Sequence, residues 1–182
     1  LVDLSGSMQG EKIAETFKGV AMMAEALNNV GIPFSIYGFQ DYVYEFKSFD
    51  EKWDDNKKES ILSILKYPKN TESGDNSDGY ALDKVFNKVV LADPKDINLF
   101  MVFSDGAPAP GNNRIHNEMS PADELIAVIE HIESRPEALL YGFGVGPDTD
   151  HVRTFYTNHA QAKNVKDVTR KIKEVLRKTI RV

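Results

Sequence analysis

The stretch Leu1-Val2-Asp3-Leu4-Ser5-Gly6-Ser7-Met8 opens the chain and joins the end of an apolar run to a cluster of oxygen-bearing side chains. Asp3 offers a carboxylate. Ser5 and Ser7 add hydroxyl oxygens on alternate residues of a tight turn, which Gly6 makes possible. Ligand sets made only of oxygen suit Mg²⁺, Mn²⁺ or Ca²⁺, and not zinc or copper. The motif therefore predicts a divalent-cation site at the exit of a first strand, just before a helix.

A second acidic residue follows the most hydrophobic run of the chain. Residues 99–103 read Leu-Phe-Met-Val-Phe, which predicts a strand buried on both faces, and Asp105 comes directly after it. A carboxylate at the end of a buried strand is costly unless a positive charge compensates it. On its own the first motif is explained better as a helix cap, with Ser5 or Ser7 accepting from backbone amides. Together with Asp105 it favours a cation shared between two central strands.

The rest of the chain alternates between helical and strand patterns. Apolar residues at steps of three and four predict helices over 12–30, 57–67, 80–90, 122–133 and 168–180. Short apolar or aromatic runs predict strands over 34–39, 42–46, 99–103 and 139–145, the first two forming an edge hairpin. Turn-rich segments predict loops over 68–78 and 106–121. This alternation predicts an α/β fold with a mostly parallel sheet covered by helices on both faces.

Composition narrows the class of protein. A length of 182 residues, with 41% hydrophobic and 27% charged residues, is typical of one globular domain. The net charge of -6 disfavours a nucleic-acid binder. The chain has no cysteine, which excludes thiolate ligands and fits a reducing cytoplasm. No apolar run reaches the ~20 residues of a membrane span. Because the chain opens inside a strand, we expect the first strand to be truncated and the natural protein to continue upstream.

The pattern Asp3-x-Ser5-x-Ser7, with Asp105 after the fourth strand, resembles the metal-ion-dependent adhesion site of the von Willebrand factor A (VWA) and integrin I domain superfamily. The order of elements is similar over nearly the whole chain. The resemblance implies one doubly wound VWA-type domain over 1–182, with a six-stranded sheet of order 3-2-1-4-5-6 and one antiparallel edge strand. It also implies a metal on top of the sheet, completed by waters and by an Asp or Glu of a protein partner.

One position departs from the pattern of this superfamily. The family usually places a threonine in the loop before the third helix, five residues ahead of an Ala-Leu pair. Counting back from Ala81 leads to Asn76, whose amide oxygen can ligate a hard cation, and Asp78 offers a stronger ligand two residues on. Both stay open as the loop ligand. If Asp78 binds directly, the site carries an extra negative charge and depends less on an acidic partner.

Within the superfamily, residues 103–108 (Phe-Ser-Asp-Gly-Ala-Pro) and the loop 76–82 resemble a bacterial subgroup, the cobalt-chelatase T subunit and nitric-oxide-reductase activation proteins. This likeness implies an intracellular adaptor that works with a AAA+ ATPase to remodel or metallate a client. We therefore predict a cytoplasmic, divalent-metal-dependent protein-binding module that is not an enzyme and neither binds nucleic acid nor spans a membrane.

The alternative function is a metal-dependent phosphoester hydrolase. Asp3, Asp78 and Asp105 around Mg²⁺ would activate a water molecule in such an enzyme. Lys and Arg are absent from residues 1–10 and 75–82, and Arg114 is the one candidate in the third loop to clamp a phosphate. No general base is identifiable near these loops, so the sequence favours binding over catalysis.

Overall fold

A computed structural model describes residues 1–65, 76–92 and 97–179 of the chain. Its strands are β1 (Val2–Asp3), β2 (Ile36–Phe39), β3 (Val43–Lys47), β4 (Asn98–Ser104), β5 (Ala138–Val145) and β6 (His159–Ala162). They form one sheet of order β3-β2-β1-β4-β5-β6, in which β3 runs antiparallel to β2 and all other neighbours are parallel. The expected strand order and the antiparallel edge hairpin are confirmed.

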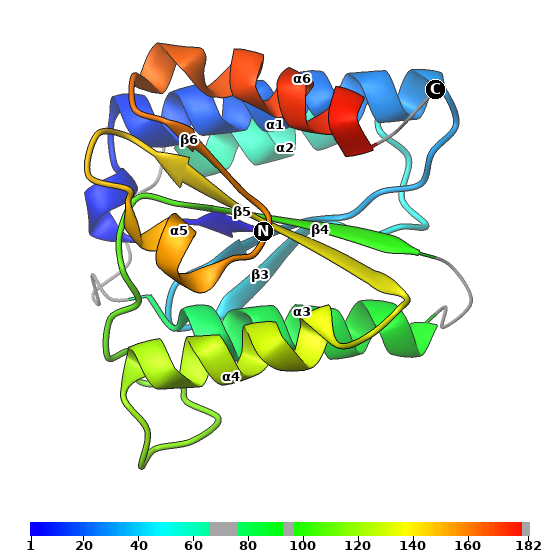
Figure 1. The fold of residues 1–182 in the computed structure, drawn as a ribbon. Helices are drawn as coiled ribbons and strands as arrows, with labels where there is room; N and C mark the ends of the chain where they lie inside the picture. Colours follow the sequence, from blue (N-terminus) through cyan, green and yellow to red (C-terminus); the bar gives the residue numbers. More distant parts are fainter. Residues whose placement is uncertain (66–75, 93–96, 180–182) are drawn as a thin grey trace.

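Helices cover the sheet on both faces (Figure 1). The helices are α1 (Glu11–Asn29), α2 (Asp55–Leu65), α3 (Asp78–Ala92), α4 (Pro121–Glu133), α5 (His151–Phe155) and α6 (Val168–Thr179), with 3-10 turns η1 (Gly6–Met8) and η3 (Val165–Asp167). In Figure 1, α1, α2 and α6 lie above the sheet, and α3 and α4 lie below it. No helix in the described ranges is long and apolar enough to cross a membrane.

The central strand β4 shows why the sheet is covered on both sides. Successive side chains of a strand point to opposite faces. Phe100 and Val102 belong to the core between the sheet and helices α3 and α4. Met101 and Phe103 belong to the core between the sheet and helices α1 and α6. A strand with apolar side chains on both faces has to be covered on both faces, and this is what the continuous apolar run at 99–103 predicted.

Several element boundaries differ from the expectation. Asp78, expected in the loop 68–78, is the first residue of α3, where its carboxylate lies at the positive end of the helix dipole. Strand β6 was not anticipated from its residues, because His-Ala-Gln-Ala has no apolar run and lies at the sheet edge. The expected helix end at Tyr67 and most of the loop 68–78 lie outside the described residues.

The candidate site lies where the chain leaves two neighbouring strands and turns to opposite faces of the sheet. β1 and β4 are parallel neighbours, with Val2 opposite Phe103. The chain after β1 enters α1 above the sheet, and the chain after β4 enters α4 below it (Figure 1). In open α/β sheets, ligands bind at this switch point, outside the carboxyl ends of the strands. Asp3 and Asp105 lie at those two ends.

Candidate metal centre

The first motif folds into a tight turn around the Asp3 carboxylate. Asp3 ends β1 and is fully buried. Its Oδ1 accepts a hydrogen bond of 2.7 Å from the Ser5 backbone N–H, which holds the following residues against it. The turn continues as η1, in which the Met8 N–H donates to the Ser5 carbonyl at 3.0 Å. The hydroxyl oxygens of Ser5 and Ser7 then lie 3.0 Å apart.

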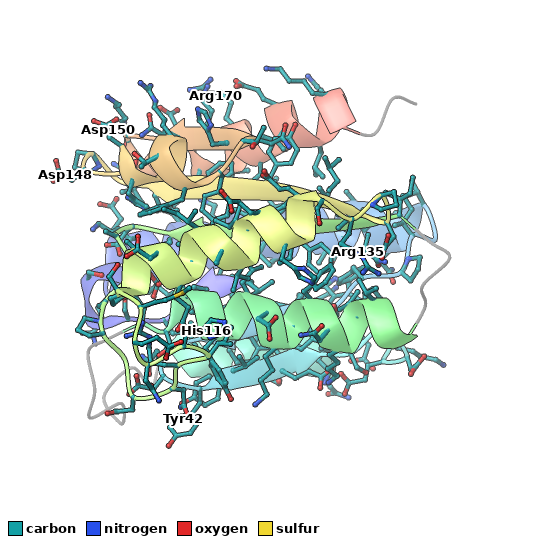
Figure 2. All side chains as sticks on the ribbon, turned by 60° about the horizontal axis from the view of Figure 1, so that its bottom comes forward. Tyr42, His116, Arg135, Asp148, Asp150 and Arg170 are labelled. Carbon is teal, nitrogen blue, oxygen red and sulfur yellow. The ribbon has the colours of Figure 1, made fainter. Side chains whose placement is uncertain are left out.

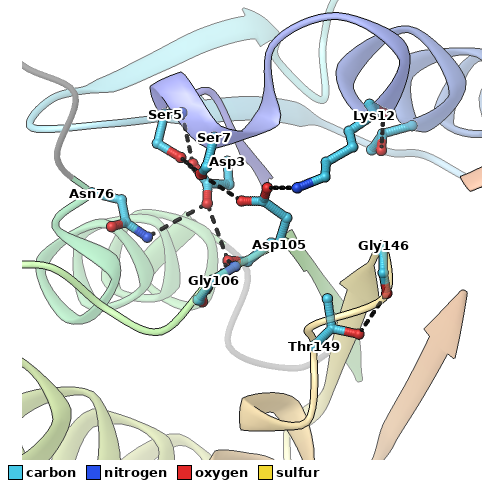
Figure 3. Close-up of polar contacts among 11 residues, drawn as sticks. Asp3, Ser5, Ser7, Lys12, Asn76, Asp105, Gly106, Gly146 and Thr149 are labelled. Atoms are coloured by element: carbon cyan, nitrogen blue, oxygen red, sulfur yellow. Dashed lines mark hydrogen bonds and ion pairs between the residues drawn. The ribbon is translucent and has the colours of Figure 1, made fainter. Parts of the chain in front are cut away.

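Asp105 joins this turn from the neighbouring strand. The Ser7 hydroxyl donates to Asp105 Oδ1 at 2.7 Å, so the two segments meet although 98 residues separate them. The Ser104 hydroxyl donates to Asp3 Oδ2 at 3.1 Å and provides a second bridge between β1 and β4. Figure 3 shows these side chains converging at the end of the sheet. The structure thus brings together Asp3, Ser5, Ser7 and Asp105, four of the residues that the sequence offers as metal ligands.

The third segment carries both candidates for the loop ligand, Asn76 and Asp78, and their side-chain oxygens differ in hydrogen bonding. The Asn76 amide nitrogen donates to Asp3 Oδ2 at 3.4 Å, while its oxygen accepts from the Ala109 N–H at 3.2 Å. Asp78 is buried, and its Oδ2 has no hydrogen-bond partner among the residues that the structure describes. The amide oxygen that was expected to face the ion is therefore engaged elsewhere, whereas a carboxylate oxygen of Asp78 is unpartnered.

The buried carboxylates disfavour each other's charge. Burial raises the pKa of Asp3 to about 6, and the Asp105 carboxylate adds to this shift. Burial also raises the pKa of Asp78 well above its usual value, and the charges of Asp3 and Asp105 raise it further. A cation among these groups would relieve both effects, because it favours the ionised form of each acid.

The donor set suits a hard divalent ion. Carboxylate and hydroxyl oxygens converge, and an unpartnered buried carboxylate oxygen is the kind of group that an ion satisfies. Within the described residues, no three His, Cys, Asp or Glu side chains form a cluster that would hold a metal by themselves. The residues present therefore fit a metal that takes the Ser5 and Ser7 hydroxyls beside the carboxylates.

A lysine enters the site that the sequence analysis did not anticipate. Basic residues were judged absent from positions 1–10, yet Lys12, in the first turn of α1, forms an ion pair with Asp105 Oδ2. Nothing in the linear sequence links residues 12 and 105, because the contact depends on how α1 leaves the turn. Arg114, the one basic candidate in the third loop, instead pairs with Glu124 at 3.1 Å.

The loop between β4 and α4 is held by two further buried carboxylates. Glu124 Oε2 accepts from the backbone N–H groups of Ile115 at 3.2 Å and His116 at 3.0 Å, in addition to Arg114. Asp41, after β2, accepts from the Asn112 backbone N–H at 2.9 Å and from its side chain at 2.8 Å. These contacts fix the loop that carries Ala109 against Asn76.

Comparison with known proteins gives one curated relative and several solved structures of the same fold. The chain is 31% identical over 119 residues to the uncharacterized protein YojO of Bacillus subtilis, and the match covers 60% of the chain and 18% of YojO. The mussel byssus proximal thread matrix protein 1 superposes with a TM-score of 0.69 at 15% identity, covering 96% of this chain and 45% of that one. The PilB minor pilin of Streptococcus sanguinis gives 0.66 at 13% identity, covering 98% and 59%.

These likenesses show the fold, and the chain spans only part of each of these proteins. The mussel protein has also been solved with a zinc-occupied MIDAS motif, the metal-ion-dependent adhesion site, with a TM-score of 0.59 at 16% identity over 96% of this chain and 46% of that one. The family model of the cobalamin biosynthesis protein CobT VWA domain matches residues 1–66 and 69–181, nearly the whole chain. The chain therefore belongs to the family of CobT VWA domains.

Proposed function

We propose that this domain binds a protein partner through a divalent cation held at the carboxyl ends of β1 and β4. The observation that carries the proposal is the unbroken set of contacts from Asp3 through Ser5 and Ser7 to Asp105. These residues come from two strands, and three of them are buried polar groups. A structural role for the serines as helix caps does not explain why two buried carboxylates converge on them.

We infer that Asp78 rather than Asn76 is the loop ligand. The Asp78 carboxylate has an unpartnered oxygen, whereas the Asn76 oxygen accepts from Ala109. A carboxylate would then take the place of a neutral loop ligand, and its charge would add to that of Asp3 and Asp105 while the serine hydroxyls and waters complete the coordination. An acidic partner would meet a less positive ion than in a site with a neutral loop ligand, and this favours modest, reversible docking.

The position of Ser7 supports a docking role. Ser5 is buried beneath the turn, whereas Gly6 and Ser7 are exposed. An ion on the Ser7 side of the turn would face solvent and keep water there until an Asp or Glu of the partner replaces it. Mg²⁺ suits such a role because it retains several waters and is seldom enclosed by protein alone. Mn²⁺ and Ca²⁺ share its preference for oxygen ligands.

Titration calorimetry with Mg²⁺, Mn²⁺, Ca²⁺ and Zn²⁺ tests the metal site. We expect Asp3→Asn and Asp105→Asn to abolish binding while the circular dichroism spectrum stays unchanged, because each replacement keeps the shape and removes an anionic ligand. Asp55→Asn is the matched control, since that carboxylate is fully exposed at the start of α2. Unchanged affinity in both site variants would refute the proposed site.

The docking role is tested separately with Mn²⁺. Water-proton relaxation measures whether bound Mn²⁺ retains exchangeable water, and a docking site should show it. An ion saturated by protein oxygens would give no such enhancement, which would keep the site but contradict the docking role. Turnover of p-nitrophenyl phosphate that requires metal and disappears in Asp3→Asn would instead favour the hydrolase.

The finer part of the proposal is an adaptor for a AAA+ ATPase. Its support is the membership in the CobT VWA family and the likeness of residues 103–108 to the cobalt-chelatase subgroup. We expect a AAA+ ATPase encoded next to this chain to copurify with it in the presence of Mg²⁺. EDTA or the Asp3→Asn substitution should release the ATPase. Copurification that persists in EDTA would argue against a metal-mediated contact.

A further inference from the structure

We propose that Lys12 is a built-in counter-cation of the metal site, which keeps the domain folded without an ion and lowers its affinity for one. The inference rests on the proposed metal site and adds a regulatory element to it. Lys12 lies outside the metal motif, yet its ammonium group pairs with Asp105.

The ammonium group contacts the oxygen of Asp105 that the serine turn does not use. Ser7 donates to Oδ1 of Asp105, whereas Lys12 Nζ donates to Oδ2. Figure 3 shows Lys12 approaching Asp105 from the side away from Asp3, Ser5 and Asn76. The lysine therefore does not fill the space among the hydroxyls where an ion would lie. It acts on the ion through charge.

The stem of Lys12 is held in place by the end of β5. Gly146, with φ of +112°, has no side chain, and a Cβ there would lie 3.2 Å from Lys12 Cε. The lysine side chain is 31% exposed, so most of it is packed. A lysine that is seated over a bare backbone turn keeps its charge at a fixed place, unlike a solvated lysine on an open helix face.

The charges that meet at the site are unbalanced without this lysine. Asp3, Asp78 and Asp105 are all buried, and they lie at the end of β1, at the start of α3 and directly after β4. Among the ion pairs of the described residues, the pair of Lys12 and Asp105 is the one that includes any of these three carboxylates. The ammonium thus supplies part of the positive charge that an ion would otherwise supply.

A fixed positive charge stabilises the ion-free site and repels the incoming ion. Both effects make the domain less dependent on metal: the ion-free state is better compensated, and the ion gains less on binding. A lysine that merely orients Asp105 for the ion would have the opposite effect on affinity, because its loss would weaken binding. The sign of the change on removal of the charge therefore distinguishes the two roles.

The experiment compares Lys12→Met, which keeps the stem and removes the charge, with Lys12→Arg, which keeps the charge. Lys18→Met is the matched control on the same helix, since Lys18 is 64% exposed and pairs with Glu15 at 3.6 Å. Melting in EDTA and calorimetric titration with Mn²⁺ are the measurements. We expect Lys12→Met to melt at a lower temperature in EDTA and to bind Mn²⁺ about tenfold more tightly. Lys12→Arg and Lys18→Met should resemble the unmodified chain.

A double variant keeps the proposal testable if Lys12→Met folds poorly. Adding Asp105→Asn removes the anion that the lysine compensates, so the double variant should regain melting temperature lost in Lys12→Met. Failure to regain it would overturn the proposal. If the unmodified chain binds Mn²⁺ and Lys12→Met binds it equally or more weakly, the role proposed for Lys12 is overturned while the proposed function stands. Absence of Mn²⁺ binding in both would overturn the proposed function as well.

Discussion

The buried carboxylates of this domain differ in how completely the protein satisfies them. Glu124 accepts three hydrogen bonds on one oxygen, from Arg114 and from two backbone N–H groups. Asp78 is buried to a similar degree, yet within the described ranges one of its oxygens has no partner. Burial and the charge of Asp3 raise the pKa of Asp78 well above its usual value. The first arrangement organises a loop, whereas the second leaves a buried carboxylate oxygen that a cation would satisfy.

The difference explains how the two regions use the same functional group, a buried carboxylate. A buried carboxylate with its own cation and N–H donors is a structural element, because nothing more has to bind. A group of buried carboxylates that repel each other favours the binding of a cation, because the cation offsets the electrostatic repulsion among them. Perturbed groups that cluster at the end of a sheet are therefore candidates for function.

The largest expected effect is on the structural pair. Arg114→Met leaves Glu124 buried without its cation, and we expect the free energy of unfolding to fall by about 3 kcal/mol. Urea denaturation measures it. The control is Arg135→Met, because Arg135 is 46% exposed and pairs with Glu137 at the other end of α4 from His116 (Figure 2). A loss no larger than that of the control would show that Glu124 does not depend on Arg114.

An intermediate effect is expected from pH at the metal site. The folded pKa of Asp3 is raised from 3.8 to about 6, so the folded state takes up a proton more readily than the unfolded chain. The stability of the metal-free domain should rise as the pH falls through 6, by about 1 kcal/mol between pH 7 and pH 5 from this group. Above pH 7 this contribution is lost.

Urea unfolding in EDTA at the two pH values measures this change, with Asp3→Asn as the reference that lacks the group. Millimolar Mg²⁺ should remove the rise, because a bound ion keeps Asp3 ionised and is released when the carboxylate is protonated. A pH dependence in EDTA that is the same in the unmodified chain and in Asp3→Asn would contradict the assignment of the raised pKa to Asp3.

The smallest expected effect is on the second structural carboxylate. Asn112→Ala removes the side-chain donor to Asp41 Oδ2 but leaves the backbone donor to Oδ1 in place. We expect a loss of about 0.5 kcal/mol in the free energy of unfolding and no change in Mn²⁺ affinity. Reduced Mn²⁺ affinity would show that the position of the loop after β4 affects ion binding. It would then weaken the distinction between the structural carboxylates and those of the candidate metal site.

Linear patterns were sufficient for the alternation of helices and strands because the signals are local, whereas the strand order of the sheet was implied by the resemblance to the VWA superfamily. A run such as 99–103 has apolar side chains on both faces, and helices repeat them every three or four residues, so the alternation of elements follows from the order of the chain. β6 was missed at the residue level because His-Ala-Gln-Ala carries neither signal. Its place at the edge of the sheet depends on pairing with β5, which is distant from any signal within these four residues.

The sequence by itself determined that Asp3, Ser5, Ser7 and Asp105 would meet, because parallel strands bring their carboxyl ends to one edge of the sheet. Only the tertiary structure decided what surrounds them. It turned the Asn76 oxygen toward Ala109, left an oxygen of Asp78 unpartnered, and placed Lys12 against Asp105. The reason is physical: a strand end is fixed by local pattern, whereas the direction of a side chain and its neighbours across the sheet depend on packing between segments that are distant in the chain.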